Sequence, residues 1–299
     1  MNSFGIHALV WVTDWDLDSI RFTAEQTAAA GYGMVEAVIF DPSQARPAET
    51  AKVFDEFGLD AITGMALNAS ADISSPDKEV ARAGEALISD AILATRDMGS
   101  KKLGGVTHSA MRRYLSAPDP DAFQRVAEVY ARLADRAREA GIQLGIEAVN
   151  RYESNIVNTV DEAARLVREV DESVLFAHID TFHMNIEEHN VVDTITRNID
   201  VIGHVHIGES HRGYLGSGSV DFAQTFQALA RAGYEGPIVL EAFSSAVLNS
   251  SVADALACWT SSWNDPMDLA QNALAYMKFQ SAAAQHGLIS RENNSRRTV

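Results

Sequence analysis

The chain of 299 residues contains a single cysteine, Cys258, so no disulfide can form within it. Proteins without disulfides are mostly intracellular, and we expect Cys258 to be a buried, inert thiol. The sequence also has no apolar run approaching the roughly 18 residues of a spanning helix, and its start, MNSFGIHALVWVTDWD, lacks the features of a signal peptide. These absences predict a soluble, cytoplasmic protein that does not insert into a membrane.

Basic residues are scarce, since 24 Lys and Arg stand against 41 Asp and Glu, which gives a net charge of −17. Such an acidic surface repels phosphate backbones, so a nucleic-acid partner is not expected. The final residues, RENNSRRTV, are polar and without periodicity. We interpret them as the end of a disordered tail from about residue 290, after a single domain that occupies the rest of the chain.

The chain also lacks a GxGxxG motif after its first apolar run and any linker rich in Pro, Gly or Ser. It contains instead eight short apolar runs typical of strands, separated by segments with helical spacing such as 121–141 and 220–233. The runs are 5–11, 34–40, 61–67, 102–106, 144–149, 175–180, 201–208 and 238–243. Alternating strands and helices indicate a parallel sheet. Eight units in 299 residues favour a (β/α)8 TIM barrel over the alternative, a doubly wound open sheet.

Glycine recurs at the end of the helical segments, just before the next apolar run. Glycine has no Cβ penalty in the left-handed conformation that commonly closes a helix. The same position in five units supports a regular repeat rather than scattered loops. The five are Gly31, Gly58, Gly99, Gly141 and Gly233.

Polar residues interrupt four successive apolar runs near their C-terminal ends: Glu147, Asp180, His206 and Glu241. In a TIM barrel these strand ends converge on the face that carries the active site. Each residue alone is readily explained as a helix cap, an ion-pair partner or a core histidine. Four of them at the same place in successive units predict a common site.

Three carboxylates and an imidazole would repel or desolvate one another unless a cation lay between them. This oxygen-rich set suits one hard or borderline divalent ion, such as Mn²⁺, Mg²⁺ or Co²⁺, better than a thiolate-bound metal. We therefore predict one metal ion held by these four residues, with Mn²⁺ as the first choice.

Further polar and aromatic residues lie near the same strand ends. They are Asn150, Arg151, Glu153, His183, Glu209, His211 and Arg212, and, near the first strand, His7, Trp11 and Trp15. Such residues either orient metal ligands or bind substrate, and His7 and Trp11 are candidates for contact with a sugar. Core packing explains either tryptophan equally well, as an ion pair does Arg151. Glu187 and Glu188 are interpreted as solvated loop charges.

Several motifs resemble the D-tagatose 3-epimerase family, which includes the D-allulose (D-psicose) and L-ribulose 3-epimerases. The segments that carry the resemblance, in order along nearly the whole chain, are WVTDW, GIEAVNRYE, HIDTFHMNIEE, GHVHIGESHRGYLGSGSVDF and PIVLEAFSS. The resemblance implies a metal ion on Glu147, Asp180, His206 and Glu241, with Glu147 and Glu241 also acting as the acid/base pair. It further implies that Glu153, His183 and Arg212 bind substrate oxygens around C1 to C3, and that the protein forms a homodimer or homotetramer.

The sequence thus predicts a metal-dependent ketose 3-epimerase that inverts C3 of a free ketose through an enediolate. The pairs D-tagatose/D-sorbose, D-fructose/D-allulose and L-ribulose/L-xylulose all remain possible substrates. The nearest alternative is an aldose-ketose or hydroxypyruvate-type isomerase on the same metal site. A phosphodiester-cleaving enzyme of the endonuclease IV type and a sugar-binding barrel without catalysis are two further alternatives. The acidic charge argues against the nuclease, because that function needs a basic groove.

Overall fold

The computed structural model describes residues 3–297, with side chains described as far as residue 289. Eight parallel strands close into a barrel in sequence order, and β1 pairs with both β2 and β8. The strands are β1 (Phe4–His7), β2 (Met34–Val38), β3 (Asp60–Leu67), β4 (Lys102–Ala110), β5 (Gln143–Glu147), β6 (Leu175–Asp180), β7 (Ile202–Ile207) and β8 (Ile238–Leu240). The predicted TIM barrel is therefore confirmed.

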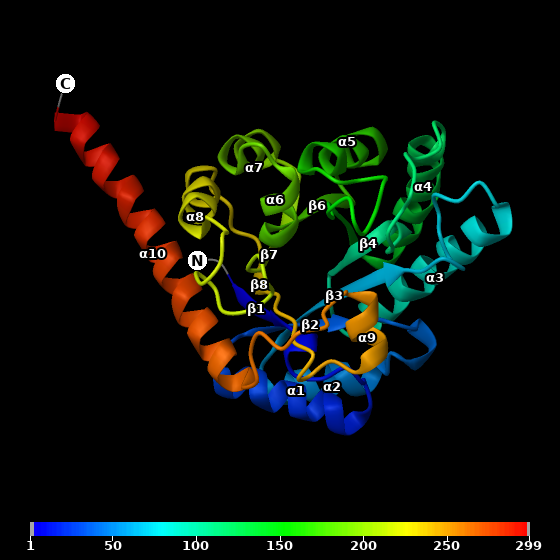
Figure 1. Cartoon of the computed structure of the whole chain (residues 1–299), viewed down its shortest axis with the longest axis horizontal. Helices are drawn as coiled ribbons and strands as arrows, with labels where there is room; N and C mark the ends of the chain where they lie inside the picture. Colours follow the sequence, from blue (N-terminus) through cyan, green and yellow to red (C-terminus); the bar gives the residue numbers. More distant parts are fainter. Residues whose placement is uncertain (1–2, 298–299) are drawn as a thin grey trace.

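Helices surround the barrel, and α10 begins near α1 and runs past α8 toward the C-terminal end of the chain (Figure 1). The α-helices are α1 (Leu17–Ala30), α2 (Pro47–Phe57), α3 (Lys78–Asp97), α4 (Ala122–Ala140), α5 (Val160–Val170), α6 (Thr181–Glu187), α7 (Val191–Asn198), α8 (Phe222–Arg231), α9 (Ser250–Ala255) and α10 (Pro266–Arg297), and the 3-10 helices are η1 (Ala8–Val10) and η2 (Pro42–Gln44). In residues 3–297, no helix is both long enough and apolar enough to cross a membrane.

The helix α4 shows how local sequence produces this packing. Its buried residues include Val126, Val129, Tyr130, Leu133 and Ala137, which recur at the spacing of one helical face. That face packs on the barrel, and each large apolar side chain contributes about 1.5–3 kcal/mol when fully buried. Gly141, with φ 70°, then ends the helix before β5, and the other four predicted glycines also have positive φ.

A one-residue irregularity between β6 and β7 aligns two of the predicted site residues. Ala177 pairs with Ile202, but His178 pairs with His204 and Asp180 with His206, so Gly203 is the extra residue. Because side chains alternate between the two faces of a strand, this shift places Asp180 and His206 side by side on the same face. A Cβ on Gly203 would lie 2.6 Å from the Phe176 side chain, so glycine permits the close approach.

Several element boundaries differ from the sequence predictions, and two of them bear on the site or the tail. The last strand ends at Leu240, so the predicted run 238–243 is too long and Glu241 follows the strand. The backbone of α10 continues to Arg297 through the segment for which we predicted a disordered tail. Residues 298 and 299 lie outside the described residues, and disorder of this tail stays a prediction.

Candidate metal centre

The four residues predicted from strand ends meet at one end of the barrel. Glu147 is the last residue of β5, Asp180 the last of β6, His206 lies within β7 and Glu241 directly follows β8. All four are buried, with at most 7% of any residue exposed. Buried carboxylates need partners, because removing them from water without compensation is costly. Their convergence therefore indicates a functional centre rather than a stabilising core.

His206 lies at the middle of this group. Its Nδ1 is 3.3 Å from Glu241 Oε1 and 3.9 Å from Glu147 Oε1. Within the described part of the chain this nitrogen has no hydrogen-bond partner. Glu147, Asp180 and His206 offer ligand atoms that all lie within 4.8 Å of one another. An orphaned buried nitrogen among carboxylate oxygens fits a divalent cation such as Mn²⁺, Mg²⁺ or Co²⁺.

Arg212 supplies positive charge to the same group. Its Nη1 donates to Asp180 Oδ2 at 2.8 Å and to Glu241 Oε2 at 2.5 Å. The guanidinium lies 3.8 Å from the ring centroid of Phe182 and 5.0 Å from that of Phe243. A Cβ on Gly208 would lie 2.7 Å from this Nη1, so the glycine leaves room for the arginine.

The three carboxyl groups differ in acidity because their neighbours differ. Burial raises the pKa of Glu147 well above its ordinary value, although His206 opposes the shift. Burial likewise raises the pKa of Asp180 to about 6, against the influence of Arg212. At Glu241, burial is outweighed by Arg212 and His206, which hold its pKa well below the ordinary value. Crowded carboxylates resist ionising together, and a bound cation would relieve that repulsion.

Two predicted substrate-binding residues, His183 and Glu153, share the neighbour Asn150. His183 Nε2 is 3.8 Å from Glu147 Oε1 and 3.7 Å from Asp180 Oδ2. Its Nδ1 accepts from the backbone N–H of Asn150 at 3.1 Å, which leaves Nε2 directed at the carboxylates. The amide of Asn150 also donates to Glu153 Oε1 at 2.9 Å. Asn150 thus positions both His183 and Glu153, and burial raises the pKa of Glu153.

Of the aromatic and imidazole groups in the N-terminal region, one lies in the site and two pack against helices. His7 reaches the site, with Nε2 3.8 Å from Glu241 Oε1. The Trp11 indole donates to Thr27 in α1 and is 5% exposed, as expected for a core residue. Trp15 similarly donates to Thr50 in α2. His7 therefore joins the centre, whereas a sugar contact by Trp11 stays a prediction.

Glu209 organises the loop that carries Arg212. Although fully buried, its carboxylate accepts three backbone N–H bonds, from Ser210 at 2.7 Å, Gly216 at 2.9 Å and Val220 at 3.2 Å. The backbone N–H of Arg212 in turn donates to the Glu209 carbonyl at 2.8 Å. The loop is thereby fixed even though Arg212 has the unfavourable φ of 58°.

Replacing Glu209 with Ala should destabilise the protein by about 3 kcal/mol, because buried N–H groups would lose a charged acceptor. Chemical unfolding in urea measures the difference. Glu209→Gln, which keeps one oxygen acceptor, should lose less. Equal stability of the wild type and the Ala variant would contradict this role for the carboxylate.

The interpretation of Glu187 and Glu188 as solvated charges is wrong. Glu187 accepts from the guanidinium of Arg151 at 2.7 Å, and its side chain is 6% exposed. Glu188 accepts from the backbone N–H of Val160 at 2.8 Å and from the Thr194 hydroxyl. Glu187, the last residue of α6, thus contacts the segment after β5, and Glu188 contacts the start of α5 and α7. Arg151 is thus engaged in the ion pair that the sequence left open.

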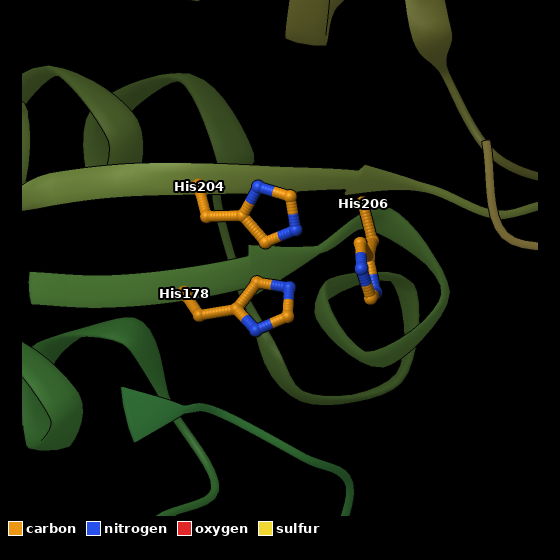
Figure 2. Close-up of side chains that lie close together, drawn as sticks. All are labelled: His178, His204 and His206. Carbon is orange, nitrogen blue, oxygen red and sulfur yellow. The ribbon is translucent and has the colours of Figure 1, made fainter. Parts of the chain in front are cut away.

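Four further buried residues of the strands, Glu36, His108, His178 and His204, surround the centre and were not among the residues predicted from sequence. Glu36 accepts from both His204 and His206, His108 Nε2 lies 3.0 Å from the Glu147 carbonyl, and His178 Nδ1 is 3.8 Å from Glu147 Oε2. Figure 2 shows the rings of His178, on β6, and of His204 and His206, on β7, close together. In the sequence, each of these residues is marked only as a polar residue within an apolar run.

A cavity of about 250 Å³ opens beside Arg212. It is lined by Glu153, Phe182, Ser210, His211, Arg212, Phe243, Leu256, Ala257, Cys258 and Thr260. Its volume is below the ~300–1,000 Å³ typical of drug-sized ligands, so it suits a small polar molecule. Cys258 is only half-buried, contrary to our expectation, although burial raises the pKa of its thiol and so disfavours the reactive thiolate.

Comparison with known proteins places this geometry in a family. Residues 24–278 match the model of the xylose isomerase-like TIM barrel. A ketose 3-epimerase of Arthrobacter globiformis is 38% identical over 92% of this chain and 95% of its own length. An L-ribulose 3-epimerase of Methylomonas sp. (strain DH-1) is 40% identical over 92% of this chain and 96% of its own.

A solved structure shows the same correspondence in three dimensions. The D-allulose 3-epimerase from Methylomonas sp. in complex with D-allulose superimposes with a TM-score of 0.91 at 38% identity. The match covers 93% of this chain and 97% of that one. The resemblance drawn from sequence motifs is thus confirmed, and the chain belongs to the ketose 3-epimerases of the xylose isomerase-like TIM-barrel family.

Proposed function

We propose that this protein interconverts free ketoses at C3, using one divalent metal ion held by Glu147, Asp180, His206 and Glu241. The observation that carries the proposal is the approach of two buried glutamates, Glu147 and Glu241, to the same unpaired Nδ1 of His206. Mn²⁺ is the proposed ion, with Mg²⁺ and Co²⁺ as alternatives. When bound, the ion would polarise the ketose carbonyl and so make the neighbouring C3 proton easier to remove.

The protein's own groups then perform the proton transfers. One of Glu147 and Glu241 takes the proton from C3, which gives an enediolate, and the other returns a proton to the opposite face. The two glutamates come from β5 and the end of β8, with β6 and β7 between them. Bases on two sides of one carbon invert its configuration and allow the reaction in either direction.

Substrate oxygens would be held by the polar groups beside the carboxylates. Arg212 and Glu153 both line the cavity. His183 Nε2 faces the carboxylates because its Nδ1 is engaged by Asn150. We assign these three to the oxygens around C1 to C3, and His7 and Trp11 to the remainder of the sugar.

The test of this function is to incubate the protein with a ketose and restored metal in D₂O and to follow the sugar by NMR. D-Tagatose, D-fructose, D-allulose and L-ribulose form the substrate panel. We expect deuterium at C3 of both epimers as the mixture approaches equilibrium. Label at C1 together with formation of an aldose would instead establish aldose-ketose isomerisation.

The proposed setting is cytoplasmic, and the proposed assembly is a homodimer or homotetramer. A net charge of −17 is consistent with a soluble protein that has no nucleic-acid partner. Sedimentation velocity at several protein concentrations would establish the assembly, and a single monomeric species throughout would contradict it.

A further inference from the structure

A buried carboxylate lies in the barrel interior beneath the proposed metal ligands. Glu36, on β2, is 1% exposed, and its neighbour His204, on β7, is fully buried. Interiors of TIM barrels are mostly filled with branched apolar side chains. A charged residue is costly there unless it is paired, so its position requires an explanation.

The explanation lies in its contact with a metal ligand. Glu36 Oε2 accepts from the Nε2 atoms of both His204 and His206, each at 2.7 Å. When the Nε2 of His206 carries the hydrogen of this bond, its Nδ1 keeps the lone pair needed to bind a metal ion. That Nδ1 is the atom directed toward Glu241 and Glu147.

The backbone reserves space for this carboxylate. Gly64, on β3, has no side chain, and a Cβ at this position would lie 2.8 Å from Glu36 Oε1. A larger residue would displace the end of the Glu36 side chain, and with it the bond to His206. The position of the Glu36 carboxylate thus depends on the absence of a side chain at residue 64.

The three histidines of Figure 2 could alternatively hold a second ion, since ring nitrogens of His178, His204 and His206 lie within 4.8 Å of one another. The contacts favour a positioning role instead. Glu36 Oε2 already bonds the Nε2 atoms of His204 and His206, so an ion among the three rings could use only their Nδ1 atoms and the nitrogens of His178. The Nδ1 of His206 is instead directed at Glu241 and Glu147.

We propose that Glu36 is a positioning residue that holds the His206 ring with Nε2 protonated and Nδ1 free to bind the metal ion. This inference rests on the metal site of the proposed function. Groups that orient a metal-bound histidine typically change metal affinity about 10–100-fold when they are lost. We expect a loss of that size without any change in the four ligands themselves.

The experiment measures Co²⁺ binding to the metal-stripped full chain, by calorimetry and by the visible spectrum of the bound ion. Glu36→Gln keeps the shape of the side chain but removes its charge, and Gly64→Ala keeps Glu36 but displaces it. Both should bind Co²⁺ at least about tenfold more weakly and with an altered spectrum. If Glu36→Gln does not fold, Gly64→Ala alone still tests the proposal.

Two control variants separate this role from general damage. Gly33→Ala introduces a methyl group that meets no described atom within 4 Å, and Thr95→Val removes a buried hydrogen bond to Thr63. Both should keep the wild-type Co²⁺ affinity.

Wild-type affinity and spectrum in Glu36→Gln would overturn this inference alone. Two Co²⁺ ions per wild-type chain, with the second lost in His178→Ala, would also overturn it, because the three histidines would then form a metal site of their own. A wild-type protein that binds no Co²⁺ would overturn the proposed metal dependence as well.

Discussion

Replacing Glu241 with Gln should lower kcat for C3 epimerisation by about 10³–10⁴-fold, and Glu147→Gln should do the same. A glutamine side chain has nearly the same shape but cannot accept a proton from C3. Because each half of the inversion needs its own base, the loss of either glutamate should stop turnover. Initial rates at saturating ketose and metal, with the metal content of each variant measured in parallel, test this.

Deuterium exchange distinguishes proton transfer from metal binding. A variant that keeps only one base should still exchange the C3 proton of the epimer facing that base, without producing the other epimer. The complementary variant should exchange only the opposite epimer. This pattern would assign each glutamate to one face of the sugar. If both variants turned over within tenfold of the wild type, the acid/base assignment would be wrong.

Glu187→Gln is the matched control. Glu187 is a carboxylate near the same end of the barrel, but it pairs with Arg151 rather than with the centre. Its replacement should leave kcat within a few-fold of the wild type and affect mainly stability. An equal loss of activity in this variant would show that any change of charge near the site is sufficient.

The convergence of strand ends at one face of a barrel explains why the four proposed ligands could be grouped from sequence. Glu147, Asp180, His206 and Glu241 all lie near the C-terminal ends of apolar runs, so a single rule about barrel ends grouped them. The rule could not reveal how Asp180 comes to lie beside His206. That depends on the extra residue Gly203, and a shift in pairing leaves no pattern in the letters of a single strand.

Among the missed residues, Glu36 depends on contacts between strands that are not neighbours. Glu36 lies on β2 and its partners on β7, and β1 and β8 stand between these strands on one side of the barrel. In the run MVEAVIF, Glu36 has no local feature that distinguishes it from a stray polar residue. The burial of Glu187 was also missed, because its partner Arg151 belongs to the preceding βα unit and is distant in sequence.

Removing the metal should abolish epimerisation and lower thermal stability together. Each added divalent ion should restore activity to an extent that ranks Mn²⁺ against Mg²⁺ and Co²⁺. At an ion concentration of 1,000 times its Kd, binding stabilises the folded state by about 4 kcal/mol. For a chain of this size that corresponds to a rise of roughly 6 °C in Tm. Calorimetry of chelator-treated protein, with and without added ion, measures this change in Tm.

Asp180→Asn tests whether this stabilisation comes from the proposed centre. Asp180 also accepts the backbone N–H of Phe182 at the start of α6 and a bond from Arg212. Asparagine keeps an oxygen for the helix cap but removes the charge that binds the ion. The variant should therefore fold, yet its Tm should rise little when Mn²⁺ is added. An undiminished rise in Tm would mean that the ion binds elsewhere, because weakening one of four ligands in a single centre must weaken the effect of the ion on folding.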